Sequence, residues 1–171
     1  MQLILIRHGI AVDPEKYAAC PGAEPERPLT ERGVKRAKRA ARGLRRVVDR
    51  IDLIATSPYS RAVQTAEIFC HALRKSDRSQ IASLPALAPG GAPKTLIDWL
   101  RQQDQNATIA LVGHEPDLSR LLSVLTTGNA IDVVRFGKAG AALLHCMDEV
   151  VEGGCELLWF LPPSILRRLG I

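Results

Sequence analysis

The sequence predicts an α/β fold in which helices cover both faces of a mainly parallel sheet. Short apolar runs typical of buried strands alternate with segments of helical periodicity along most of the chain. The last two apolar runs are separated by the short Gly-containing turn EVVEGG, which predicts an antiparallel hairpin at one side of the sheet. No repeat or linker interrupts the 171 residues, so we expect a single domain spanning residues 1–171.

Each expected element follows from a local pattern. Apolar runs predict strands at residues 2–6, 52–56, 107–112, 141–146 and 155–160, with a further short strand at 132–136. Apolar residues at helical spacing predict helices at residues 30–49, 61–74, 93–104 and 116–126. Two segments rich in proline and alanine, 13–28 and 84–93, are expected to run over the surface as loops.

Composition narrows the class of protein. Apolar residues make up 46% of the chain and charged residues 24%, which is typical of a globular protein. No apolar run approaches the ~18 to 20 residues that cross a bilayer, and the first residues lack the pattern of a signal peptide. We therefore expect a cytoplasmic protein without a membrane partner.

The four cysteines do not predict a metal site. Cys20, Cys70, Cys146 and Cys155 form no CxxC pair and lie far from the histidines in sequence, so they are expected to be ordinary reduced thiols. Cys146 and Cys155 could face each other across the last hairpin, although a bridge in a reducing compartment would be an exception.

Much of the net charge of +5 lies in the expected helix at residues 34–50. Its apolar positions recur at helical spacing and leave a set of cations on the other faces: Lys35, Arg36, Lys38, Arg39, Arg42, Arg45 and Arg46. Two interpretations stay open, a solvated helix face or a dock for an acidic partner or polyanion. Few aromatic residues and no nucleic-acid-binding module argue against a nucleic-acid partner.

Polar side chains follow three of the expected strands. Arg7, His8 and Gly9 end the first, Arg61 opens the helix after the second, and His114 ends the third. Since ligands bind at the carboxyl ends of parallel strands, two arginines and two histidines should converge at one edge of the sheet.

This set of residues suits a phosphoryl group. Arginine binds phosphate oxygens through its planar fork, and a helix N-terminus adds to the positive field. A neutral imidazole can then attack phosphorus, and either His8 or His114 could do so on chemistry alone. His8 is favoured because it follows its strand directly and Gly9 allows a close approach of substrate. Ser57 either donates to phosphate or shapes the turn before Pro58.

The motifs resemble those of the histidine phosphatase superfamily, the phosphoglycerate mutase-like RHG proteins. The matching stretches are LILIRHG (3–9), RPLTERG (27–33), SPYSRAVQTAEI (57–68), LPALAPGG (84–91), LVGHEPDLS (111–119) and FGKAGAALL (136–144). The resemblance implies a three-layer α/β/α sandwich that needs neither metal nor cofactor. It also implies that His8 is the nucleophile, and that Arg7, Arg61 and His114 form the phosphate pocket.

Within that superfamily the chain is most similar to the short SixA type, the protein phosphohistidine phosphatases. Mutases and sugar bisphosphatases carry a proton-donating glutamate in the segment that is LPALAPGG here, and this segment contains no acid. An imidazole leaving from a phosphoramidate needs little help from a proton donor, whereas an alkoxide needs more. Asp13 and Glu115 are the remaining candidate donors, although Asp13 also fits a surface loop and Glu115 also fits a helix cap.

We therefore expect a phosphatase that removes phosphate from a phosphohistidine on a protein, such as a histidine phosphotransfer domain. The alternative is a phosphatase of small phosphomonoesters or nucleotides that uses the same pocket. A third hypothesis, from another class, is a catalytically idle module that binds phosphate without releasing it.

Overall fold

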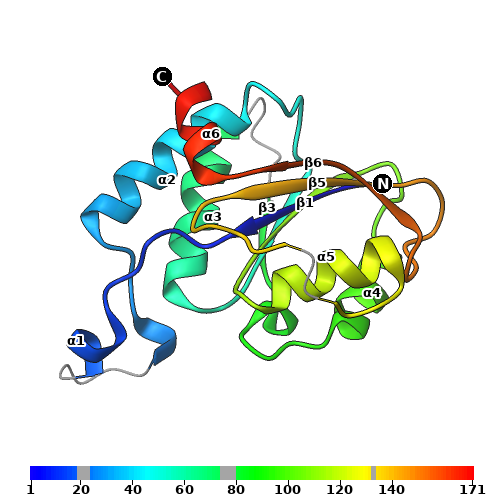
Figure 1. Cartoon of the computed structure of the whole chain (residues 1–171), viewed down its shortest axis with the longest axis horizontal. Helices are drawn as coiled ribbons and strands as arrows, with labels where there is room; N and C mark the ends of the chain where they lie inside the picture. The colour runs from blue at the N-terminus through cyan, green and yellow to red at the C-terminus, as the bar shows by residue number, and fades with distance from the viewer. Residues whose placement is uncertain (19–23, 74–79, 132–133) are drawn as a thin grey trace.

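The computed structural model describes residues 1–18, 24–73, 80–131 and 134–171, which form a sheet with helices on both sides (Figure 1). The strands are β1 (Gln2–Arg7), β2 (Leu53–Thr56), β3 (Gln80–Ser83), β4 (Thr108–Gly113), β5 (Ala141–Cys146) and β6 (Cys155–Leu161). The helices are α1 (Pro14–Ala18), α2 (Glu31–Leu44), α3 (Ser60–Leu73), α4 (Pro93–Arg101), α5 (Asp117–Thr127) and α6 (Pro163–Leu169). Two short 3-10 segments, η1 (Glu24–Glu26) and η2 (Pro85–Leu87), complete the assignment.

The sheet is mainly parallel, as predicted. Its six strands lie in the order β3-β2-β4-β1-β5-β6. Parallel pairing joins β3 to β2, β2 to β4 and β4 to β1. The expected hairpin lies at one side, with β5 antiparallel to both β1 and β6. Four parallel strands therefore end at one edge of the sheet, and β1, β2 and β4 are adjacent there.

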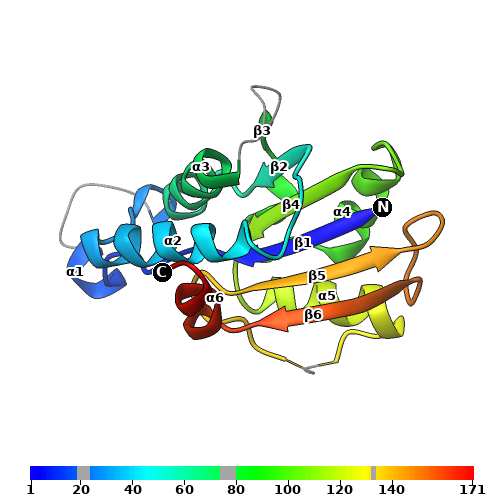
Figure 2. The ribbon, with the colours of Figure 1, turned by 90° about the horizontal axis from the view of Figure 1, so that it is seen from above.

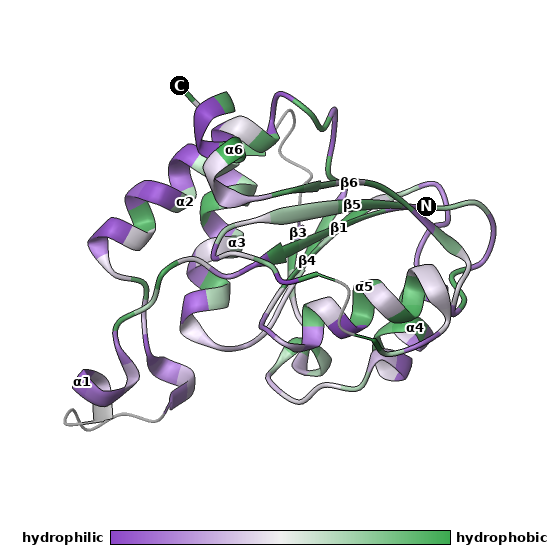
Figure 3. Ribbon diagram, viewed as in Figure 1, coloured by the Kyte–Doolittle hydropathy of each residue, from purple (hydrophilic) through white to green (hydrophobic). Residues whose placement is uncertain are grey.

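Helices cover the two faces in separate layers (Figure 2). Successive side chains of a strand point to opposite faces, and β1 follows this rule. Leu3 and Leu5 pack in one core cluster with α4 and α5, and Ile4 and Ile6 pack in the other with α2, α3 and α6. The predicted three-layer α/β/α sandwich is confirmed. The hydropathy colouring shows mainly apolar strands at its centre and a strongly polar α2 on the outside (Figure 3).

A close contact holds the start of α2 against the loop that follows β1. Thr30 caps the helix, because its side chain accepts a hydrogen bond of 2.9 Å from the backbone N–H of Gly33. A Cβ atom on Gly33 would lie only 2.0 Å from the carbonyl oxygen of Ile10. The glycine therefore lets the helix backbone approach the loop next to His8, and this contact fixes the path of that loop.

The differences from the predicted elements concern short or irregular segments. The structure adds β3, α1 and α6, which are four, five and seven residues long. Elements of this length carry little hydrophobic periodicity, and β3 is a largely exposed edge strand. Of the strand expected at 132–136, residues 134–136 are not extended into a strand, and residues 132–133 lie outside the described residues. Residue 74 of the expected second helix also lies outside them.

The basic helix is shorter than expected. It ends at Leu44, and a turn follows, although Val48 and Ile51 continue the apolar spacing. Both side chains are buried in the core from the segment after the helix. Periodicity therefore reported their burial correctly and their secondary structure wrongly.

The expectation of reduced thiols is wrong for one pair. Cys146 and Cys155 form a disulfide with an S–S distance of 2.19 Å. They are direct partners across the β5–β6 ladder, with Cα atoms 4.3 Å apart. The expectation rested on the redox compartment, whereas the strand register brings these two sulfur atoms together. Cys20 lies outside the described residues, and Cys70 is buried in α3.

Among the residues that the structure describes, no helix combines the length and the apolar character that crossing a membrane requires.

Candidate active site

The predicted site residues meet at the carboxyl ends of β1, β2 and β4. The backbone N–H of His8 donates to the carbonyl oxygen of Gly113 at 3.0 Å, and that of Ser57 donates to Val112 at 3.0 Å. These bonds tie together the three segments that leave the strands. As a result, the rings of His8 and His114 lie 4.9 Å apart, centroid to centroid.

The His8 ring is held in one tautomer. Its Nδ1 atom lies 2.7 Å from the carbonyl oxygen of Gly9. A carbonyl oxygen only accepts hydrogen bonds, so Nδ1 carries the proton and Nε2 keeps a free lone pair. Gly9 is anchored in turn, because its N–H donates to the Thr65 hydroxyl at 3.0 Å.

Burial and positive neighbours keep His8 neutral. The residue is 6% exposed. Burial lowers the pKa of its imidazole to about 2, with further lowering from His114, Arg61 and Lys138 that the hydrogen bond to Gly9 partly offsets. At physiological pH the ring is therefore an uncharged base with an available lone pair.

His114 is neutral for similar reasons. Burial, followed by the charges of Arg61 and Arg7, lowers the pKa of His114 to about 4. Its Nε2 atom lies 2.8 Å from the hydroxyl oxygen of Ser57. The Tyr59 ring meets it edge-on with centroids 5.2 Å apart. These contacts fix the orientation of the second imidazole against the first.

The two predicted arginines are shielded from solvent to different degrees. Arg61 is 4% exposed, its guanidinium carbon lies 4.8 Å from the centroid of the Tyr59 ring, and Arg7 is half-buried. Burial is the main cause that lowers the pKa of each guanidinium. In the part of the chain that the structure describes, the Nε atoms of both are buried without a hydrogen-bond partner. Buried donors of this kind favour an anionic ligand.

An ion-pair network that sequence reasoning missed surrounds Arg61. Glu24 accepts two hydrogen bonds of 2.8 Å from Arg27 and forms an ion pair of 3.0 Å with Nη2 of Arg61. Arg27 is 8% exposed and also donates to the carbonyl oxygen of Val12. The hydrogen bond from Arg27 is the main cause that lowers the pKa of Glu24. Arg27 belongs to the RPLTERG stretch, and the resemblance of this stretch to a family motif was the sequence feature that could have pointed to it.

Lys138 is a further cation that was missed. It is half-buried, and its pKa is lowered first by burial and then by Arg7, Arg27 and Arg61. The next residue, Ala139, has a φ of 63°, a conformation that costs an L-residue about 1 kcal/mol. Hydrogen bonds offset this cost, since the N–H of Ala139 donates to the carbonyl oxygen of Arg7 at 3.0 Å. The FGKAG stretch, which resembles a family motif, was the sequence feature that could have pointed to Lys138.

The two candidate proton donors have different surroundings. Asp13 is exposed and accepts a hydrogen bond of 2.9 Å from the backbone N–H of Glu15. Its charge adds to the raised pKa of Arg27 and offsets a part of the lowering of the pKa of Lys138. Both carboxylate oxygens of Glu115 lie 2.8 Å from the Ser119 hydroxyl.

Glu115 also connects to the phosphate-pocket arginine. It accepts a hydrogen bond from the backbone N–H of Phe136, whose carbonyl oxygen accepts one of 2.6 Å from Arg7. Glu115 therefore fixes the position of Phe136, whose carbonyl oxygen in turn orients Arg7.

The arrangement brings cations and neutral imidazoles together. Among residues 1–18, 24–73, 80–131 and 134–171, no group of three or more histidine, cysteine or acidic side chains is placed to hold a metal ion. Several guanidinium and ammonium groups instead surround two uncharged histidines. Chemically, this set can bind an oxyanion and present a nitrogen nucleophile to it.

Comparison with known proteins agrees with this chemistry. The family model described as histidine phosphatase superfamily (branch 1) matches residues 3–88, which is half of the chain. The chain belongs to the histidine phosphatase superfamily. It is therefore a phosphatase, a hydrolase with a histidine nucleophile, as the motifs predicted.

Individual relatives of this histidine phosphatase extend the comparison. An uncharacterised protein of a Picosynechococcus strain is 35% identical over 142 residues, which cover 82% of each chain. The structure of the protein histidine phosphatase SixA complexed with tungstate is 25% identical, with a TM-score of 0.81, and the match covers 97% of this chain and 99% of that one. The alpha-ribazole phosphatase from Shigella flexneri is 17% identical, with a TM-score of 0.73 and coverage of 95% and 97%. The predicted likeness to the SixA type is confirmed.

Proposed function

We propose that His8 is the nucleophile of this phosphatase and that Arg7, Arg61 and His114 bind the phosphoryl group. The observation that carries the proposal is the hydrogen bond from His8 Nδ1 to Gly9, because it leaves the lone pair on Nε2 among buried cations. Arg7 and Arg61 would neutralise the phosphoryl oxygens, and their unpaired buried Nε–H groups would gain an acceptor.

The reaction then proceeds in two displacements at phosphorus. In the first, the lone pair of His8 Nε2 forms an N–P bond, the bond to the leaving group breaks, and the leaving group takes its electron pair and a proton from solvent water. In the second, a water oxygen attacks phosphorus, the N–P bond breaks, and its electron pair returns to Nε2. The attacking water releases one proton to the solvent, which replaces the proton taken in the first displacement. Inorganic phosphate and neutral His8 are the products.

The substrate that we propose is a phosphohistidine on a protein, such as a histidine phosphotransfer domain. Support comes from the likeness to SixA and from the acids at the site. The Glu115 carboxylate is engaged by Ser119 and Phe136, and Asp13 accepts a backbone hydrogen bond in an exposed loop. With both acids engaged in this way, the site favours an imidazole leaving group, which is less basic than an alkoxide.

The test compares two substrates in a buffer that contains EDTA. Phosphate release is measured from a histidine-phosphorylated protein and from a simple aryl phosphate, with wild type beside His8→Ala. We expect a clear preference for phosphohistidine and no turnover by His8→Ala. Turnover by His8→Ala would contradict the assigned nucleophile, and a preference for the aryl ester would contradict the assigned substrate.

A second candidate substrate class is the small phosphomonoester. The observation that favours it is the electrostatic contact of Asp13 with Lys138 and Arg27, which places one carboxylate near the cations of the site. If esters are the substrates, Asp13→Asn should lower turnover of an alkyl phosphate far more than turnover of phosphohistidine. An equal effect on both substrates would argue against a donor role for Asp13.

A further inference from the structure

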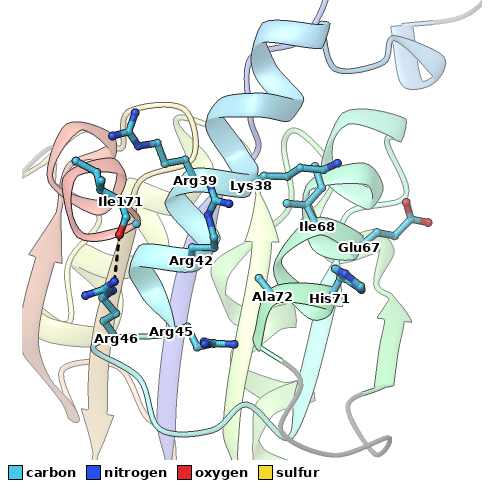
Figure 4. A pocket seen from close by; sticks show the side chains of 11 residues that line it. Lys38, Arg39, Arg42, Arg45, Arg46, Glu67, Ile68, His71, Ala72 and Ile171 are labelled. Atoms are coloured by element: carbon cyan, nitrogen blue, oxygen red, sulfur yellow. Dashed lines mark hydrogen bonds between the residues drawn. The ribbon is translucent and has the colours of Figure 1, made fainter.

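A basic groove lies between α2 and α3, on the helical layer that packs over one face of the sheet (Figure 4). It has a volume of about 1040 Å³. Lining residues come from α2, α3, the turn after α2 and the end of the chain: Lys38, Arg39, Arg42, Arg45, Arg46, Glu67, Ile68, His71, Ala72, Gly170 and Ile171. We refer to this feature as the α2–α3 groove.

The groove has an excess of uncompensated positive charge. It contains five cationic side chains, all exposed, and one carboxylate, that of Glu67. Among the described residues, none of the five forms an ion pair with an aspartate or glutamate side chain, whereas Arg27, Arg50, Arg61, Arg101 and Arg120 all do. Arg46 donates a hydrogen bond of 3.1 Å to the backbone oxygen of Ile171. The groove is therefore complementary to an acidic ligand.

The floor of the groove is partly apolar. Ile68 and Ala72 on α3 are partly exposed beside the cations of α2. Lys38 and Arg45 extend from the α2 side toward α3 in Figure 4. A simple polyphosphate would leave this apolar floor without a partner, whereas a peptide with acidic and apolar side chains would satisfy both surfaces.

The distance to the active site sets the size of the ligand. His71 lies ten residues after Arg61 on α3, which corresponds to about 15 Å along the helix. A small phosphorylated metabolite bound at His8 cannot also reach His71. A protein that presents its phosphohistidine to His8 can reach both places.

We propose that the α2–α3 groove binds an acidic, amphipathic segment of the phosphoprotein substrate while the phosphohistidine of that protein enters the active site. This inference rests on the proposed function, because it takes the substrate to be a protein. In this arrangement the cations of the groove select the substrate, and the separate set of residues around His8 performs the chemistry.

The test uses two synthetic phosphohistidine peptides. Each joins phosphohistidine to an amphipathic segment through about five extended residues, which span about 15 Å. One segment carries glutamates between leucines, and the other carries glutamines at the same positions. Versions with the segment before and after the phosphohistidine cover both chain directions, and kcat/KM is measured for each peptide.

Two double variants separate the groove from general electrostatics. Arg42→Gln with Arg45→Gln removes two groove charges, one on α2 and one directly after it. Arg32→Gln with Lys35→Gln removes two exposed charges of α2, with the same spacing, outside the groove. Wild type and the control variant should prefer the acidic peptide by about tenfold, and the groove variant should lose this preference. Turnover of an aryl phosphate should be unchanged in the groove variant.

The outcomes distinguish the two proposals. Equal turnover of both peptides by wild type, or an equal loss in the control variant, overturns the groove assignment and leaves the phosphohistidine substrate standing. If neither peptide is hydrolysed while the aryl phosphate is, the proposed substrate fails. Fluorescence anisotropy with the unphosphorylated acidic peptide then decides the groove, because binding that Arg42→Gln with Arg45→Gln abolishes supports it and absent binding overturns it.

Discussion

Mild acid should destabilise this protein strongly, because two buried histidines stay neutral in the folded state. Burial is the main cause that lowers the pKa of His8 to about 2 and of His114 to about 4, whereas unfolded histidine titrates near 6.5. Below pH 6.5 the unfolded state binds two protons, one on each histidine, that the folded state does not bind. Their contribution to stability is complete above that pH and is lost as the pH falls toward the folded pKa values.

The magnitude follows from these shifts. Each histidine lowers the free energy of unfolding by about 1.4 kcal/mol for every pH unit below 6.5. Together, the two should lower it by about 4 kcal/mol between pH 7.5 and pH 5. His8→Asn removes one of the two groups and should reduce this fall to about 2 kcal/mol. Urea denaturation at a series of pH values, in a buffer free of phosphate, measures the free energy directly.

A second histidine variant provides the control for this measurement. His71→Asn removes an exposed imidazole on α3 outside the active site and serves as the variant against which the fall in His8→Asn is compared. A wild-type free energy of unfolding that stays level from pH 7.5 to pH 5 would refute the assignment of neutral, buried histidines. An unchanged fall in His8→Asn would refute the contribution of His8.

Three further predictions concern binding and stability. Lys138→Met should raise the inhibition constant of inorganic phosphate about tenfold, because it removes a half-buried cation beside the site. An unchanged inhibition constant would show that Lys138 does not contact the bound phosphate. Gly33→Ala should lower the urea-derived free energy of unfolding by about 2 kcal/mol, because the new Cβ meets the carbonyl oxygen of Ile10, and a neutral effect would contradict that contact. Reduction of the Cys146–Cys155 bridge with dithiothreitol should lower this free energy by about 2 kcal/mol, and equal stability with and without reductant would speak against the bridge.

Residues at the ends of regular elements could be predicted from the sequence. Arg7, Arg61 and His114 each follow or open an element with clear periodicity, and parallel strands bring such ends to one edge of a sheet. Their convergence could therefore be predicted from the sequence, whereas for Ser57 the sequence left a phosphate donor and a turn residue as alternatives.

Residues carried by loops could not be placed in this way. Glu24 and Arg27 lie in a segment expected to be a surface loop, and Lys138 lies between two elements in a turn that depends on the positive φ of Ala139. Hydrophobic periodicity does not report the path of a loop, so their approach to Arg61 and Arg7 depends on tertiary contacts. The resemblance of RPLTERG and FGKAG to family motifs marked these stretches without assigning a role to either cation.

The same reasoning explains the elements that were missed. The exposed edge strand β3 and the short helix α6 contain too few buried residues to produce a periodic signal. In contrast, Val48 and Ile51 satisfied the periodicity of a helix while packing in the core from an irregular segment after the helix. Periodicity reports which side chains are buried, and it reports the backbone only where the element is long.

In the proposed mechanism, His8 carries the phosphoryl group between the two displacements. The most direct measurement is to mix the enzyme with a histidine-phosphorylated protein, stop the reaction within one turnover under alkaline conditions, and locate phosphate on the enzyme by mass spectrometry. The proposed mechanism predicts phosphate on the peptide that contains His8 in wild type and none in His8→Ala. Phosphate on a peptide that contains His114 instead, or a labelled His8→Ala enzyme, would contradict it.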